Sequence, residues 1–143
     1  MDNCEEVLRL VQKEAKHPFL IAIDGRCAAG KTTLAGRIQS SMECNVIHMD
    51  DFYLPFSERT EEKMMQPGGN MDFERLLIEV LLPLRRGTNS LYRPYDCHHD
   101  TFLPSKELNA AVPTIVEGSY SCHPRLQENY DLRVFMDISP ERQ

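Results

Sequence analysis

The segment FLIAIDGRCAAGKTTLAGRI, residues 19–38, constrains the fold more than any other part of the chain. It begins with five apolar residues, which is typical of a short strand buried on both faces of a parallel sheet. A turn with a glycine at each end follows, and the apolar spacing after it predicts a helix over residues 32–42. A strand, a glycine-rich turn and a helix therefore follow one another directly.

The turn fits the pattern G-x-x-x-x-G-K-[ST], whose backbone N–H groups cradle phosphate oxygens at the start of a helix. In such a loop Lys31 would bridge the β and γ phosphates of a nucleotide, and the Thr32 hydroxyl would bind Mg²⁺. The alternative is a glycine-rich turn that binds nothing. The predicted nucleotide-binding residues are Gly25, Arg26, Cys27, Ala28, Ala29, Gly30, Lys31, Thr32 and Thr33.

The rest of the chain alternates short apolar segments with amphipathic ones. This alternation predicts an α/β fold, a P-loop NTPase-type parallel sheet flanked by helices on both faces. Ligands of such sheets bind beyond the carboxyl ends of the strands. We expect helices over residues 5–15 and 71–87 and at the start of 139–143, strands over 45–50, 114–118 and 132–138, an extended segment over 91–96, and a loop over 54–70.

Carboxylates end several of the predicted strands. Asp50 and Asp51 follow the second strand, and Glu117 ends a later one. In phosphoryl transfer the protein mainly positions groups and neutralises charge, and an aspartate near Mg²⁺ can accept the proton of the attacking hydroxyl. The alternatives are solvated loop carboxylates or a cap for the next turn in the case of the two aspartates, and a glutamate in a turn before Gly118.

Composition limits the classes of protein that the chain can belong to. Its 143 residues suit one domain, and its net charge of -6 argues against sequence-independent nucleic-acid binding. No apolar run approaches the ~20 residues that span a bilayer, and the charged N-terminal segment is unlike a signal peptide. The five cysteines include no C-x-x-C pair, which favours isolated reduced thiols. We therefore expect a cytoplasmic protein with no nucleic-acid or membrane partner.

Six segments of the sequence resemble, in order, the uridine kinase family of P-loop kinases, which also includes nicotinamide riboside kinase, pantothenate kinase and phosphoribulokinase. They are IAIDGRCAAGKTT, HMDDFYLP, PGGNMDFERL, RPYD, IVEGSY and LRVFMDISPERQ. The likeness is greatest to small bacterial uridine kinase-like proteins, and it runs from about residue 19 to the last residue. It implies ATP or another NTP as phosphate donor, Mg²⁺ as cofactor and a small molecule as phosphate acceptor.

The resemblance also implies roles for single residues. Asp50 matches the family's general base on the substrate hydroxyl, close to the metal, whereas Asp51 stands where many relatives have serine. Glu117 matches a carboxylate that orients Mg²⁺ together with Thr32. Asp72 matches an acidic residue that accepts hydrogen bonds from ribose hydroxyls, and it suits equally well the N-cap of the helix that follows.

Further acceptor-site residues follow from the same resemblance. Tyr53 and Tyr95 fall where relatives place aromatic groups around the sugar and base, although tyrosines are also common packing residues. The position of the family's base-reading histidine carries Asp100, with His98 shortly before it, so the pattern leaves the base open. Arg93 is a candidate for positive charge near the site. The predicted acceptor-binding set is Tyr53, Asp72, Arg93, Tyr95 and His98.

The sequence thus predicts a kinase that moves the γ phosphate of ATP to a hydroxyl of a small ribosyl metabolite, with the 5′-OH of uridine or cytidine as the first choice. The alternatives are a kinase for nicotinamide riboside, pantothenate or another metabolite, and a nucleotide-binding module without turnover. Kinases that resemble this chain continue into an arginine-bearing lid. We therefore expect a single kinase domain over residues 1–143 without that lid, slow in turnover and prone to form a homo-oligomer.

Overall fold

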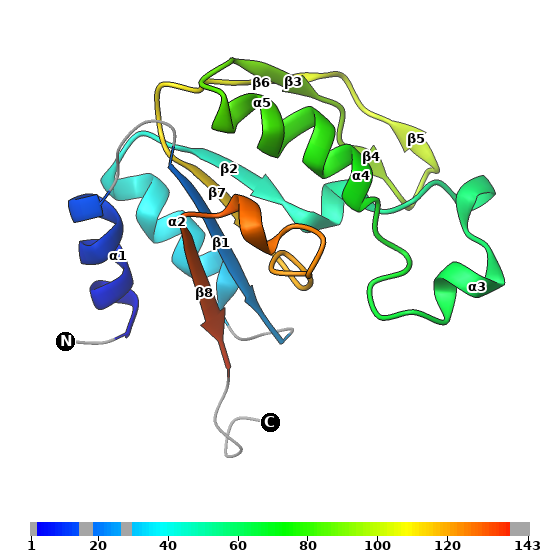
Figure 1. The fold of residues 1–143 in the computed structure, drawn as a ribbon, viewed down its shortest axis with the longest axis horizontal. Coiled ribbons are helices and arrows are strands. Elements are labelled where there is room, and N and C mark those ends of the chain that lie inside the picture. Colours follow the sequence, from blue (N-terminus) through cyan, green and yellow to red (C-terminus); the bar gives the residue numbers. More distant parts are fainter. Residues whose placement is uncertain (1–2, 15–18, 27–29, 138–143) are drawn as a thin grey trace.

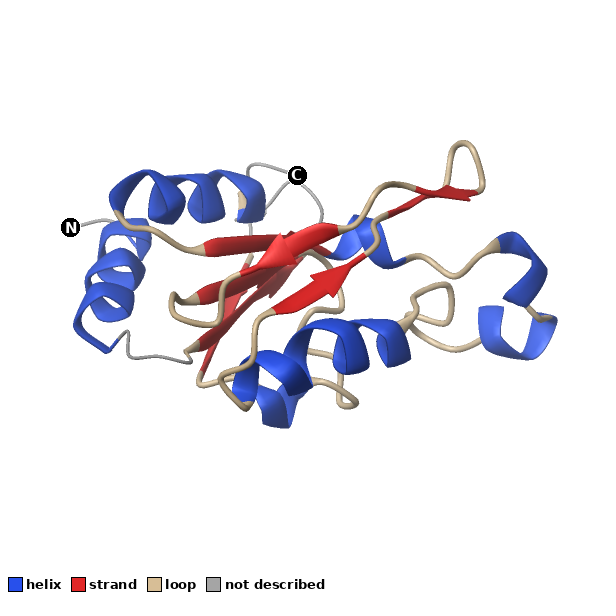
Figure 2. Ribbon diagram, turned by 90° about the horizontal axis from the view of Figure 1, so that it is seen from above, coloured by secondary structure: helices blue, strands red, loops and turns tan. Residues whose placement is uncertain are grey.

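A four-stranded parallel sheet forms the centre of the protein (Figure 1), whose computed structural model describes residues 3–14, 19–26 and 30–137. All three pairings within the sheet are parallel. Helices cover both of its faces (Figure 2), so the predicted α/β fold of the P-loop NTPase type is confirmed. In spatial order the strands are β2 (Asn45–His48), β7 (Thr114–Glu117), β1 (Leu20–Gly25) and β8 (Leu132–Met136).

The central strand β1 is buried on both faces, as its unbroken apolar sequence predicts. Side chains alternate between the two faces of a strand, so Leu20 and Ala22 belong to one hydrophobic cluster and Ile21 and Ile23 to the other. All four are at most 1% exposed. The strand is thereby fixed between two cores, and its carboxyl end delivers the glycine-rich turn to a defined place.

Two helices cover the face that carries Ile21 and Ile23. They are α1 (Asn3–Glu14) and α2 (Lys31–Ser41), which begins directly after the glycine-rich turn. Leu34 and Ile38 lie four residues apart on α2, both are buried against the sheet, and Val11 of α1 belongs to the same cluster. Both helices were expected from the apolar spacing of the sequence.

One long helical run covers the other face, and it changes its winding in the middle. It consists of α4 (Phe73–Leu76), the π-helical η3 (Leu77–Leu81) and α5 (Leu82–Arg85). A proline ring clashes with the carbonyl four residues earlier in a regular α-helix, and Pro83 lies just after the π turn. The wider turn, in which the Leu82 N–H bonds to the Leu77 carbonyl, accommodates it. The sequence predicted a single uniform helix here.

Several short elements connect these layers. The predicted loop 54–70 contains two one-turn helices and projects away from the sheet (Figure 1). None of the described helices is long and apolar enough to cross a membrane. The expected helix start at 139–143 lies outside the described residues. The short elements are η1 (Met49–Phe52), η2 (Phe56–Glu58), α3 (Glu61–Met64) and η4 (Gln127–Asn129), with two antiparallel strand pairs, β3 (Ser90–Tyr92) with β6 (Lys106–Leu108) and β4 (Tyr95–Asp96) with β5 (Thr101–Phe102).

Candidate functional site

A cavity of about 730 Å³, which we call the main cleft, opens beyond the carboxyl ends of β1, β2 and β7. Its volume lies within the range of small-molecule sites. Its position is the one at which parallel α/β sheets bind ligands. The described residues that line it are Asp24, Gly25, Arg26, Lys31, Thr32, Asp50, Tyr53, Asn70, Met71, Glu117, Gly118, Ser119 and Tyr120.

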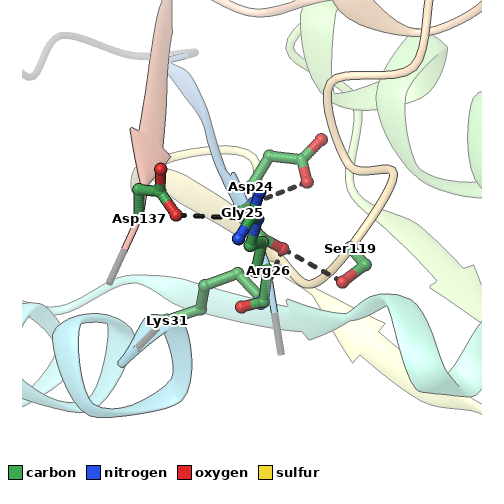
Figure 3. A network of polar contacts seen from close by, with 6 residues as sticks. All are labelled: Asp24, Gly25, Arg26, Lys31, Ser119 and Asp137. Carbon is green, nitrogen blue, oxygen red and sulfur yellow. Dashed lines mark hydrogen bonds and ion pairs between the residues drawn. The ribbon is translucent and has the colours of Figure 1, made fainter. Parts of the chain in front are cut away.

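The glycine-rich turn forms one end of the main cleft. Gly25 has a φ of 143°, and a Cβ atom placed there would lie 2.0 Å from the Met136 carbonyl oxygen, so only glycine fits beside β8. The Lys31 side chain folds back over the turn, where Nζ donates to the carbonyls of Gly25 at 2.9 Å and Arg26 at 2.6 Å (Figure 3). A cation is thus held at the mouth of the predicted phosphate loop.

The other predicted nucleotide-binding residues contribute less to what the structure describes. Cys27, Ala28 and Ala29 lie outside the described residues. Thr33 is exposed on α2 and is not among the residues that line the main cleft. The exposed Arg26 guanidinium lies 3.8 Å from the Asp137 carboxylate, and a pair between two exposed groups contributes little to stability.

A hydroxyl and a carboxylate meet beside the phosphate loop. Thr32 Oγ1 donates to Glu117 Oε2 at 3.3 Å, and the other oxygen of Glu117 lies 2.5 Å from His48 Nδ1. Glu117 is 6% exposed, and the hydrogen bond with this carboxylate raises the pKa of His48 above its usual value. The histidine thereby orients the carboxylate that the family resemblance implies as a ligand of Mg²⁺.

The oxygen atoms present here fit Mg²⁺, which prefers hard oxygen ligands and is commonly bound through one or two carboxylates plus substrate phosphates. Thr32, Glu117 and Asp50 all line the main cleft. Within residues 3–14, 19–26 and 30–137, no group of three or more His, Cys, Asp and Glu side chains could hold a metal ion. The donor set therefore suits an ion that also takes ligands from nucleotide phosphates and water.

The two adjacent aspartates lie in different environments. Asp50 is exposed and lines the main cleft, where its Oδ1 accepts a hydrogen bond from the Tyr53 hydroxyl at 3.3 Å. Asp51 is half-buried and is not among the residues that line the main cleft, and its burial raises the pKa of the carboxyl above its usual value. Both aspartates belong to the tight turn η1, and of the two only Asp50 lines the main cleft.

Asp24 joins the glycine-rich turn to the loop that follows β7, and both of these segments line the main cleft. Its carboxylate accepts the backbone N–H groups of Gly25 at 2.6 Å, Tyr120 at 3.1 Å and Cys122 at 2.8 Å. The Ser119 hydroxyl adds a bond of 3.1 Å to the Gly25 carbonyl (Figure 3). Asp24 was not singled out from the sequence, because its partners Tyr120 and Cys122 lie more than ninety residues away and leave no local signal.

Asp72 caps a helix in the structure. Its Oδ1 accepts the backbone N–H of Arg75 at 3.1 Å at the start of α4, which satisfies one of the free N–H groups of the first turn. Asp72 lines a smaller cavity of about 320 Å³, which adjoins the main cleft through the shared residue Met71. The helix-cap alternative is therefore present, and a contact of the other oxygen with ribose stays a prediction.

The remaining predicted acceptor residues lie on or beside the hairpin of β4 and β5. Tyr95 is 2% exposed and packs against Phe102 at 5.3 Å between ring centroids. Its hydroxyl group donates a hydrogen bond to the Asp100 carboxylate. The guanidinium of Arg93 lies 4.4 Å from the centroid of the Phe102 ring, and His98 is exposed. None of Arg93, Tyr95 and His98 is among the described residues that line the main cleft, whereas Tyr53 is.

Known proteins with related sequences are kinases. Uridine-cytidine kinase B of Dictyostelium discoideum is 29% identical over 137 residues, which cover 89% of this chain and 56% of that protein. Uridine kinase of Saccharomyces cerevisiae is 26% identical over 133 residues, which cover 84% of this chain and 26% of that protein. The chain thus spans less than two thirds of the length of these curated relatives. No model of a protein family matches it.

The fold has a counterpart among solved structures. A possible uridine kinase from Bacillus stearothermophilus superposes with a TM-score of 0.78 and 19% identity, over 97% of this chain and 82% of that one. With its parallel sheet and its strand, glycine-rich turn and helix, the chain has the fold of a P-loop kinase. Within this class, the chain is similar in sequence to uridine and uridine-cytidine kinases.

Proposed function

We propose that the protein transfers the γ phosphate of ATP, or of another nucleoside triphosphate, to a hydroxyl group of a small metabolite. The observation that carries this proposal is the composition of the main cleft. Lys31, Thr32 and Glu117 line it together with Asp50 and Tyr53, so phosphate-binding and proton-accepting groups share one cavity. A module that only binds nucleotide has no use for an aspartate at a second, acceptor end of the same cleft.

Different residues of the main cleft would perform different parts of the reaction. The Lys31 ammonium would leave the carbonyls of Gly25 and Arg26 for the nucleotide phosphates, because phosphate oxygens carry more negative charge. Thr32 and Glu117 would hold Mg²⁺, which when bound neutralises charge on the β and γ phosphates. Asp50 would accept the proton of the acceptor hydroxyl, and the Tyr53 hydroxyl would orient the Asp50 carboxylate.

The acceptor that we propose first is a nucleoside such as uridine or cytidine, phosphorylated at its 5′-OH. Support comes from the names of the sequence relatives and from the aromatic side chain that Tyr53 contributes to the acceptor end. Nicotinamide riboside and pantothenate remain alternatives, since the predicted base-reading segment around His98 departs from the uridine pattern. An assay with a panel of acceptors is therefore needed to identify the substrate class.

The test is an ADP-release assay on this chain with ATP, Mg²⁺ and one acceptor at a time from uridine, cytidine, nicotinamide riboside and pantothenate. We expect ADP release that depends on a nucleoside and that disappears when Mg²⁺ is chelated. Release that depends only on pantothenate would change the acceptor and leave the kinase proposal in place. Nucleotide binding without acceptor-dependent ADP release from any of the four would contradict the proposal.

Two substitutions of Asp72 separate its roles. Asparagine is as good an N-cap as aspartate, so Asp72→Asn should leave the free energy of unfolding nearly unchanged, whereas Asp72→Ala should lower it by about 1 kcal/mol. Both changes should weaken a ribosyl acceptor by roughly 10-fold or more, because hydrogen bonds to a charged group contribute about 1.5–3 kcal/mol each. Urea denaturation and the KM values for acceptor and ATP are the measurements. Wild-type KM values for acceptor and ATP in Asp72→Asn would mean that Asp72 caps the helix and does not bind the acceptor.

A further inference from the structure

Tyr120 has a backbone conformation that its side chain makes unfavourable. Its φ is 71°, in the left-handed region that glycine and asparagine adopt readily and bulky residues rarely do. Only one other non-glycine residue in the described part of the chain, Asp100, has a positive φ. Strained residues of this kind persist where the surroundings hold them, and they cluster at ligand sites.

The surroundings of Tyr120 hold its backbone on both sides. Its N–H donates to Asp24 Oδ1 at 3.1 Å, and its carbonyl accepts the N–H of His123 at 3.0 Å. Two residues later the N–H of Cys122 donates to the other oxygen of Asp24 at 2.8 Å. All these bonds use the backbone of the turn, so glycine at position 120 would keep them without strain. The tyrosine side chain must therefore serve something other than the turn.

Tyr120 is one of the residues that line the main cleft. The residue is 40% exposed although its neighbours Ser121 and Cys122 are buried. The ring packs against Gly68, where a Cβ atom would lie 3.2 Å from the ring atom Cδ1, so the missing side chain makes room for the ring. Tyr120 also lines a neighbouring cavity of about 530 Å³, so it borders both spaces.

Three more residues with suitable side chains line the main cleft beside the proton-accepting end. Tyr53 contributes a second ring, Met71 an apolar side chain and Asn70 an amide that can donate and accept hydrogen bonds. Aromatic rings bind planar ligands by contact area and stacking, whatever the pattern of polar atoms on the ligand. Flexible open-chain ligands gain less from a flat wall.

We propose that Tyr120 is a specificity-determining residue, whose ring packs against the planar ring of the phosphate acceptor and favours ring-bearing acceptors over open-chain ones. This inference rests on the proposed kinase function and adds a residue that neither the glycine-rich motif nor the predicted acceptor set contains. The strained backbone of Tyr120 keeps an aromatic ring at a position where the hydrogen bonds of the turn do not require one. Asp24 is the positioning residue that holds it.

The experiment compares Tyr120→Gly with Tyr120→Phe. Glycine removes the ring and relieves the backbone strain, whereas phenylalanine keeps the ring. Equilibrium dialysis measures the Kd of uridine, cytidine, nicotinamide riboside and pantothenate in the presence of Mg²⁺ and a non-hydrolysable ATP analogue. The Kd of the ATP analogue alone, the melting temperature and acceptor-dependent ADP release are measured on the same samples.

We expect Tyr120→Gly to weaken the ring-bearing acceptors by about 10-fold, as stacking on an aromatic side chain implies. Its affinity for the ATP analogue and for pantothenate should stay within about twofold, and its melting temperature should be unchanged or higher, because glycine suits a positive φ. Tyr120→Phe should match the wild type. A lower melting temperature with equal losses for every ligand would show that Tyr120 only packs against Gly68, and it would overturn the inference.

The outcomes also separate this inference from the proposed function. Ring-dependent binding without ADP release would support the role of Tyr120 and contradict the kinase proposal. ADP release that is undiminished in Tyr120→Gly at sub-saturating concentrations of the nucleoside would support the kinase proposal and overturn the role of Tyr120. Failure of the wild-type chain to bind any of the three ring-bearing acceptors would overturn it as well.

Discussion

Replacing Lys31 by alanine should abolish turnover and weaken nucleotide binding by roughly 10²-fold or more. Lys31 is 9% exposed, and its ammonium group already donates two hydrogen bonds to carbonyls of the glycine-rich turn. Nucleotide phosphates would replace those carbonyls, and each hydrogen bond to a charged group contributes about 1.5–3 kcal/mol. The loss of two such bonds accounts for the expected factor, and the loss of positive charge at the transferring phosphoryl group accounts for the lost turnover.

The measurements are the Kd of ATP by equilibrium dialysis and the rate of ADP release. A matched control is Lys13→Ala, which removes the same charge from an exposed position on α1, and its Kd should equal that of the wild type. The melting temperature of Lys31→Ala shows whether the turn still folds when the two bonds to its carbonyls are gone. A wild-type Kd of ATP and wild-type turnover in a folded Lys31→Ala variant would contradict the assignment of the glycine-rich turn as a phosphate-binding loop.

The parts of the fold that could be predicted are those with strong local patterns. The unbroken apolar run of β1 and the spacing of Leu34 and Ile38 on α2 determine burial without reference to distant residues. The π turn before Pro83 and the one-turn helices within 54–70 were not predicted, because they depend on packing and on turn geometry. Elements of one turn leave too few residues for a periodic signal.

The residues of the candidate site also fall into two groups, those that the sequence predicts and those that it does not. Lys31, Asp50 and Glu117 could be placed in one cleft from the sequence, because the carboxyl ends of neighbouring parallel strands meet at one edge of the sheet. Asp24 and Tyr120 could not, because their importance comes from hydrogen bonds between loops distant in sequence and from a positive φ. A bond between residues 24 and 120 changes no local pattern.

Asp50→Asn should lower kcat by about 10²-fold or more while nucleotide affinity changes little. Asparagine has the shape of aspartate, and its oxygen can still accept the Tyr53 hydroxyl, so the tight turn η1 should fold as before. It cannot accept a proton at neutral pH, and loss of a general base typically costs 10²- to 10⁴-fold in rate. Because Asp50 is exposed, the substitution leaves no buried group without a partner.

Asp51→Asn is the matched control for this prediction. It is the same chemical change one residue further along η1, made on a half-buried carboxylate that is not among the described residues lining the main cleft. We expect wild-type kcat from Asp51→Asn, and no loss of stability, since the amide is less costly to bury than the ionised carboxylate. Single-turnover rates of ADP formation, with the protein in excess of ATP and the acceptor saturating, measure both variants, and they exclude product release as the step that is compared. A low rate in Asp51→Asn together with a near-normal rate in Asp50→Asn would assign the proton transfer to the other aspartate, and equal wild-type rates in both would leave the main cleft without a catalytic base at this position.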